Sequence, residues 1–232
     1  HGDDGLGNTF LSNTNKLPST ESAVQMILRL SREYSGQISI LTTAPLTNLA
    51  KAINLDSSLP KRINRLVIMG GSVFTGNVSA LAEANIANDP EAARIVFRSG
   101  INMTMVGLDV THKVYFEEKD LIPLKKIGSS RSDFLLNIIH YISDAYEKLT
   151  GWNRCVLHDP LAAGVYLYPD LIKTEKFYTD VEIKGELTRG MTVVDQRGRK
   201  SPEKENMRVA LEVDSQRFKL QLMESLIFWS KN

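Results

Sequence analysis

The sequence has little cysteine and no long apolar run. Its one cysteine, Cys155, excludes an internal disulfide and favours a reducing compartment. No apolar run approaches the ~20 residues that a helix needs to cross a bilayer. The first residues, HGDDGLGN, lack the cationic and apolar parts of a signal peptide. We therefore expect a cytoplasmic protein that has no membrane partner.

The sequence also lacks a strong charge of either sign. The formal net charge is +1, and no basic block is interleaved with aromatic residues, so a nucleic acid partner is not expected. A chain of 232 residues with 42% hydrophobic and 24% charged residues is ordinary for a globular protein that buries one sizeable core. Because there is no internal repeat, low-complexity tract or linker, we expect a single domain over residues 1–232.

What the sequence does contain is an alternation of short apolar runs and capped helical segments. This pattern predicts an α/β fold with an open, mostly parallel, Rossmann-like sheet flanked by helices. We expect strands at 38–43, 66–69, 101–108 and 208–213, and a pair at 177–183 and 191–195 that runs antiparallel at a sheet edge. The expected helices are at 19–36, 44–50, 89–99, 120–127, 133–149, 161–167 and 215–229.

Polar side chains gather just after the strand predicted at 66–69. Asn77, Glu83, Asn85, Asn88 and Asp89 lie within a short stretch that contains no cationic residue. Amides and carboxylates at the carboxyl end of a strand suit a small polyhydroxylated ligand such as a sugar, whose hydroxyls both donate and accept hydrogen bonds. The alternative is a capped loop, since the same residue types are common in turns and at helix starts.

A second candidate site is formed by His158 and Asp159. A histidine is easily tuned to exchange a proton near neutral pH, and the aspartate could hold a hard cation or a ribose hydroxyl. The alternative is that Asp159-Pro160 only begins a helix and His158 is packed. Tyr146 and Trp152 either are part of the core or lie beside a flat ligand.

Seven segments, taken in order, resemble the inosine–uridine nucleoside hydrolase family over most of the chain. They are HGDDGLG (1–7), TTAPLTNLA (42–50), VIMGG (67–71), GNVSALAEANIANDPEAA (76–93), GLDVTH (107–112), HDPLAA (158–163) and TRGMTVVD (188–195). The resemblance implies the nucleoside hydrolase fold and hydrolysis of the N-glycosidic bond of ribonucleosides to ribose and a free base. It also implies a calcium ion that holds the ribose diol and a water, and a homodimer or homotetramer.

The same resemblance assigns roles to individual residues. Asp159 would bind calcium through its carboxylate and Thr43 through its backbone carbonyl, and His158 would protonate the departing base. The expected substrate-binding residues are Met69, Asn77, Glu83, Asn85 and Asp159, with His1, Tyr146 and Trp152 added to them. Of these, Asn77, Glu83 and Asn85 would bind the ribose hydroxyls, Met69 would pack by the sugar, and Tyr146 and Trp152 would lie near the base.

One departure from the family pattern stands out. The aspartate motif DxDxGxDD, which in the family supplies the base and most calcium ligands, does not occur in these residues. We therefore expect an N-terminally incomplete family member whose first strand or strands are missing. Three explanations stay open: an unrecorded segment, a separate polypeptide, or a genuine truncation. The alternative function is that of a catalytically inactive ribose or nucleoside binder, or an assembly subunit.

Overall fold

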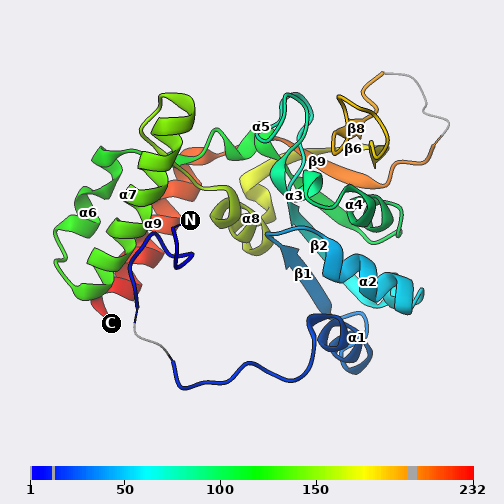
Figure 1. Cartoon of the computed structure of the whole chain (residues 1–232), viewed down its shortest axis with the longest axis horizontal. Coiled ribbons are helices and arrows are strands. Elements are labelled where there is room, and N and C mark those ends of the chain that lie inside the picture. Colours follow the sequence, from blue (N-terminus) through cyan, green and yellow to red (C-terminus); the bar gives the residue numbers. More distant parts are fainter. Residues whose placement is uncertain (1, 12–13, 198–202) are drawn as a thin grey trace. The chain divides into compact units, whose positions relative to one another are not determined.

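The structure is a computed structural model that describes residues 2–11, 14–197 and 203–232. The chain falls into two compact units (Figure 1). Unit 1 comprises residues 1–18, 111–161 and 214–232, and unit 2 comprises residues 19–110 and 162–213. The single domain expected from the sequence stays a prediction.

Unit 2 is built on a five-stranded sheet with the order β1-β2-β3-β9-β6. Its strands are β1 (Ile38–Thr42), β2 (Ile63–Met69), β3 (Met103–Val106), β9 (Met207–Val213) and β6 (Ile172–Phe177). The pairs β1–β2, β2–β3 and β3–β9 are parallel, and β6 pairs antiparallel with β9. The predicted α/β fold with a mostly parallel sheet is thus confirmed.

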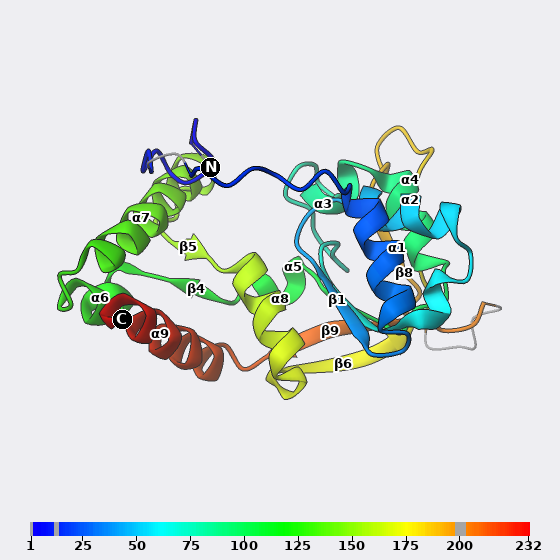
Figure 2. The same ribbon diagram turned by 90° about the horizontal axis from the view of Figure 1, so that it is seen from below.

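Three helices cover one face of this sheet: α1 (Ala23–Glu33), α2 (Thr47–Leu55) and α4 (Pro90–Phe97) (Figure 2). Alternate residues of the strands point to that face and form the buried core with the helices, among them Leu66, Ile68, Met103, Met105, Met207 and Val209. The intervening residues point to the other face of the sheet. On that face the Arg65 guanidinium donates to the Tyr166 carbonyl and lies over the Tyr166 ring.

The helix starts follow the capping residues of the sequence. Ser22 and Gln25 form a reciprocal capping box at α1, and the Asp89 carboxylate accepts a hydrogen bond from the Ala92 amide at the start of α4. A short helix, α3 (Ala84–Ala87), interrupts the polar stretch that the sequence predicted as a loop.

Unit 1 is mainly helical. It contains α6 (Ile122–Lys125), α7 (Ser130–Thr150) and α9 (Ser215–Lys231), with a two-stranded antiparallel pair of β4 (Tyr115–Phe116) and β5 (Cys155–Val156). Helix α9 packs on α7, and Gly151 ends α7 in the left-handed conformation with φ 78°. The long helix and the terminal helix predicted from the sequence are confirmed.

The remaining elements are short or cross between the units. Helices α5 (Leu108–Thr111) and α8 (His158–Leu167) each contribute residues to both units. Single-turn 3₁₀ helices lie at Leu59–Arg62, Glu118–Leu121 and Pro169–Leu171. Within residues 2–11, 14–197 and 203–232, the structure has no helix with the length and apolar character that a membrane crossing requires.

The prediction of the antiparallel edge strand was wrong in its position. The segments predicted at 177–183 and 191–195 form a separate two-stranded sheet, with β7 (Thr179–Val181) paired to β8 (Thr192–Val194). The antiparallel edge strand of the main sheet is instead β6, where Lys173, Glu175 and Lys176 are charged. An edge strand exposes one side and tolerates such residues, so the hydrophobic pattern gave no sign of it.

Candidate active site

The buried carboxylate of Glu83 organises the loop that follows β2. Glu83 is only 2% exposed. Its oxygens accept hydrogen bonds from the backbone amides of Gly71 at 2.9 Å, Asn85 at 3.0 Å and Ile86 at 3.2 Å. Glu83 therefore caps α3 and at the same time ties that helix to the carboxyl end of β2.

The two asparagines of the same stretch also have structural partners. Asn77 Oδ1 accepts from the Ala84 amide at 2.9 Å, and Asn85 Nδ2 donates to the Met69 carbonyl at 3.0 Å. Met69 is buried, Asn85 is half-buried, and Asn77 is exposed. The structure thus brings these predicted residues together in unit 2, and it supports the capped-loop interpretation for the atoms that make these bonds.

Asp109 was not singled out from the sequence, although it lies within the GLDVTH segment. Its carboxylate accepts from the amides of Val73 at 2.8 Å and Phe74 at 3.3 Å. It therefore helps Glu83 to hold the loop after β2. The sequence did contain a sign of this role. Asp109 directly follows the strand predicted at 101–108, and an aspartate in such a position commonly accepts hydrogen bonds from loop amides.

Replacing Glu83 by glutamine is expected to lower the free energy of unfolding by about 1–3 kcal/mol. The glutamine NH₂ group would replace one carboxylate oxygen and would face at least one of the three backbone N–H groups. That hydrogen bond is lost, and two N–H donors then face each other. Urea denaturation measures the change. Glu186→Gln, which makes the same charge change at an exposed position of unit 2, should stay within about 0.5 kcal/mol of the unmodified protein. Equal stability of the two variants would contradict the structural role of Glu83.

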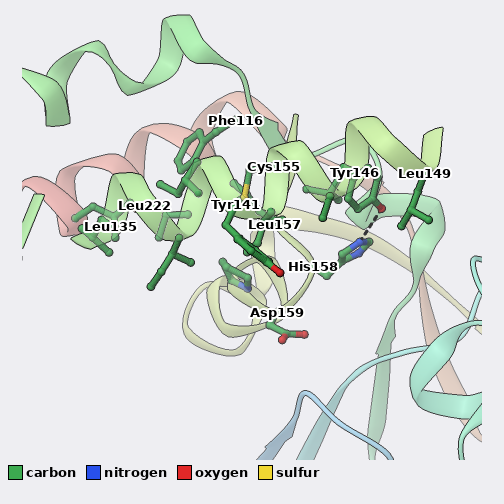
Figure 3. A pocket seen from close by; sticks show the side chains of 17 residues that line it. Phe116, Leu135, Tyr141, Tyr146, Leu149, Cys155, Leu157, His158, Asp159 and Leu222 are labelled. Atoms are coloured by element: carbon green, nitrogen blue, oxygen red, sulfur yellow. Dashed lines mark hydrogen bonds between the residues drawn. The ribbon is translucent and has the colours of Figure 1, made fainter. Parts of the chain in front are cut away.

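In unit 1, both ring nitrogens of His158 are engaged. Nε2 lies 3.1 Å from the Tyr146 hydroxyl (Figure 3). Nδ1 lies 2.8 Å from the Thr111 hydroxyl. The His112 ring meets His158 edge-on, with 5.5 Å between the ring centroids. His158 is thus held between helix α7 and the end of α5, as the packed-histidine alternative expected.

The surroundings of His158 favour its neutral form. Burial, with a smaller contribution from His112, lowers the pKa of His158 to about 4. Burial likewise raises the pKa of the Tyr146 phenol, and it raises the pKa of the Cys155 thiol to about 12. At neutral pH these three groups are therefore an uncharged imidazole, a phenol and an unreactive thiol.

Asp159 has a different environment from its neighbour. The residue is exposed in the first turn of α8, yet the protein around its carboxylate desolvates it and raises its pKa. Within the part of the chain that the structure describes, the carboxylate has no hydrogen-bond partner. A carboxylate in this situation is suited to a cation or to a ligand hydroxyl.

A groove of about 450 Å³ runs along unit 1 beside these residues. Tyr146 and His158 lie towards one end and Leu135 and Leu222 towards the other (Figure 3). Asp159 also lines it, and the rest of the lining is mostly apolar, from α7, α9 and β5. Such a surface can hold an aromatic ring next to a few polar groups.

Three further predicted residues lie apart from these clusters. Trp152 is 59% exposed, with the Arg154 guanidinium 3.9 Å above its ring, and it is not among the groove residues. Thr43 is exposed directly after β1 in unit 2. His1 lies outside the described residues.

The fit of a calcium ion can be judged from donor chemistry. Calcium takes about 6–8 oxygen ligands, and the carboxylate of Asp159 and the carbonyl of Thr43 are donors of the right type. Across residues 2–11, 14–197 and 203–232, no group of three or more His, Cys, Asp or Glu side chains could hold a metal ion. Each of the two residues, taken within its own unit, offers one oxygen donor of the type that calcium binds.

Comparison with known proteins identifies the family of the chain. The family described as "Inosine-uridine preferring nucleoside hydrolase" matches residues 1–220. The chain belongs to this family. The family resemblance predicted from the seven segments is thereby confirmed.

Individual relatives agree with this assignment. The chain is 37% identical to a pyrimidine-specific ribonucleoside hydrolase, RihA, of Salmonella gallinarum over 99% of this chain and 74% of the relative. It is also 37% identical to a probable uridine nucleosidase of Oryza sativa, over 84% of this chain and 60% of the relative. The solved structure of a purine-preferring ribonucleoside hydrolase from Gardnerella vaginalis superposes with a TM-score of 0.92 at 34% identity, covering 99% of this chain and 73% of that one. The nucleoside hydrolase fold is confirmed.

Proposed function

We propose that this chain takes part in the calcium-dependent hydrolysis of the N-glycosidic bond of ribonucleosides of the inosine and uridine type, giving ribose and a free base. The observation that carries the proposal is the family match over residues 1–220, together with 37% identity to a ribonucleoside hydrolase over 99% of the chain. The similar proteins are described by different base preferences, pyrimidine-specific and purine-preferring, so the proposal covers both kinds of base.

In unit 1, His158 is proposed as the proton donor to the departing base. Its two hydrogen bonds fix the plane of the ring and join Nε2 to the Tyr146 hydroxyl, so the proton would reach the base through that hydroxyl, which lines the groove. Tyr146 lines the same groove as His158 and is proposed to lie near the base, as is Trp152. If the base accepts a hydrogen bond while its bond to the sugar breaks, it carries less negative charge when it departs. This lowers the barrier of the reaction.

In unit 2, Asn77, Glu83 and Asn85 are proposed to bind the ribose hydroxyls, with Met69 packed by the sugar. The sugar becomes positively charged as the base departs, and a buried carboxylate stabilises such charge because little water screens it. Glu83 accepts hydrogen bonds from the backbone amides of Gly71, Asn85 and Ile86. Its three amide bonds also hold it still, which electrostatic catalysis needs.

Asp159, through its carboxylate, and Thr43, through its carbonyl, are proposed as ligands of calcium, and Asp159 also as a partner of the substrate. The ion would orient the ribose diol and polarise a water. We further propose that hydrolysis depends on an aspartate cluster of the form DxDxGxDD, which does not occur in these 232 residues. A cytoplasmic location and a homodimer or homotetramer, the latter from the family resemblance, complete the proposal.

The function is tested by measuring free base released from inosine and from uridine. In a protein that contains the aspartate cluster, we expect release in calcium, a fall of at least about tenfold after chelation with EGTA, and recovery when calcium is restored. The intact mass of the sample is measured first, because the 232 residues account for 25.9 kDa. Hydrolysis by a protein of that mass alone would contradict the need for the aspartate cluster. Absence of hydrolysis in a protein that contains the cluster would overturn the proposed function.

A further inference from the structure

Thr111 contacts His158 on the side away from Tyr146. It is the last residue of α5 and has no exposed surface, and its Oγ1 lies 2.8 Å from Nδ1 of His158. The two residues are 47 positions apart in the chain. A buried hydroxyl at this distance from a ring nitrogen forms a hydrogen bond, and the open question is which atom carries the hydrogen.

The surroundings of the Thr111 hydroxyl answer this question. Among the described residues, Nδ1 of His158 is its one hydrogen-bond partner. If the hydroxyl accepted from an Nδ1–H group, its own hydrogen would be buried without an acceptor, which folded proteins avoid. If the hydroxyl donates, only a lone pair is left unused, and oxygen lone pairs are left unused more often than buried hydrogens.

We propose that Thr111 is a positioning residue that donates its hydroxyl hydrogen to Nδ1 and thereby fixes the neutral His158 ring with its proton on Nε2. Nε2 then donates to the Tyr146 oxygen, 3.1 Å away. The hydrogen of the Tyr146 hydroxyl cannot point back at Nε2, so it is directed elsewhere in the groove that Tyr146 and His158 both line. In this chain of hydrogen bonds, Thr111 donates to His158 and His158 donates to Tyr146. The Tyr146 hydroxyl is then a hydrogen-bond donor at the groove.

Nitrogen NMR of the imidazole at neutral pH tests the proposal without any substrate. In the unmodified protein we expect Nδ1 of His158 to show the downfield shift of an unprotonated ring nitrogen, and Nε2 the upfield shift of a protonated one. Thr111→Val keeps the side-chain shape and removes the hydroxyl, so the preference for the Nε2 tautomer should fall about tenfold. Thr111→Ser should restore the preference, and Tyr146→Phe should leave it in place.

Protonation of Nδ1 in the unmodified protein would overturn the proposal, and so would an unchanged tautomer in a folded Thr111→Val variant. Should that variant fail to fold, the spectrum of the unmodified protein still decides. The kinetic consequence rests on the proposed function: Thr111→Val should lower kcat for nucleoside hydrolysis about tenfold with little change in KM, and Thr111→Ser should recover it. Because the NMR result needs no turnover, failure of the tautomer proposal and failure of the proposed function are distinguishable.

Discussion

Replacing Asp159 by asparagine, in a protein that contains the aspartate cluster, is expected to lower kcat/KM for nucleoside hydrolysis by at least about 100-fold, because a metal ligand contributes several kcal/mol to a reaction of this kind. Asparagine keeps the shape of the side chain but loses the negative charge that attracts calcium. Calcium affinity, measured by titration calorimetry, should fall together with the rate. A joint loss of both quantities is what a direct ligand predicts.

The folding stability of the Asp159→Asn variant should change little. The Asp159 carboxylate has no hydrogen-bond partner within the described part of the chain, so its replacement breaks no structural contact. Its position in the first turn of α8 makes a contribution of only about 0.3–1 kcal/mol through the helix dipole. Denaturation with urea therefore separates a catalytic loss from an unfolded protein.

Asp144→Asn is the matched control for this experiment. Asp144 lies exposed on α7 in unit 1, and the substitution changes the net charge by the same amount. It should leave both calcium affinity and kcat/KM within about twofold of the unmodified protein, since distant surface charges are screened by salt. Full activity of Asp159→Asn would exclude Asp159 as a required ligand and would move the metal role to other residues.

Much of the fold could be predicted because it depends on neighbours in sequence. Ser22 and Gln25 lie in one helical turn, and Gly151 directly follows α7, so both helix ends follow local rules. The buried strand β2 was recognised from four consecutive apolar residues, although it begins at Ile63. Its first residues include Asn64 and Arg65, and their polarity hid them from the hydrophobic pattern.

The contacts within the candidate site could not be predicted in the same way. His158 and Asp159 were singled out for their residue types, but the partner of Nδ1 is Thr111, a residue 47 positions away that the chain brings back through α7 and β5. Similarly, Glu83 was singled out for its residue type, but the donor of one of its hydrogen bonds, the amide of Gly71 12 positions earlier, was not predicted. Sequence reveals which groups can form hydrogen bonds, and only the folded chain decides which groups they meet.

Gly71→Ala is expected to be among the most destabilising single substitutions in unit 2. Gly71 has φ +73°, a left-handed conformation that costs an L-residue roughly 1–2 kcal/mol. A Cβ there would lie 2.7 Å from Thr192 Oγ1 and 2.8 Å from Met105 Sδ, and overpacking of that kind typically costs about 1–3 kcal/mol. The free energy of unfolding, measured with urea, should therefore fall by about 2–5 kcal/mol.

Gly36→Ala separates the two causes. Gly36 has a nearly equal φ of +76°, but a Cβ there would meet nothing within 4 Å, so it should lose only the roughly 1–2 kcal/mol of backbone strain. Equal losses in the two variants would show that the surroundings of Gly71 relax. Because the Gly71 amide also donates to Glu83, displacement of this residue moves the carboxylate proposed to bind ribose. Gly71→Ala should then raise KM for nucleosides even where the variant remains folded, whereas Gly36→Ala should leave KM unchanged.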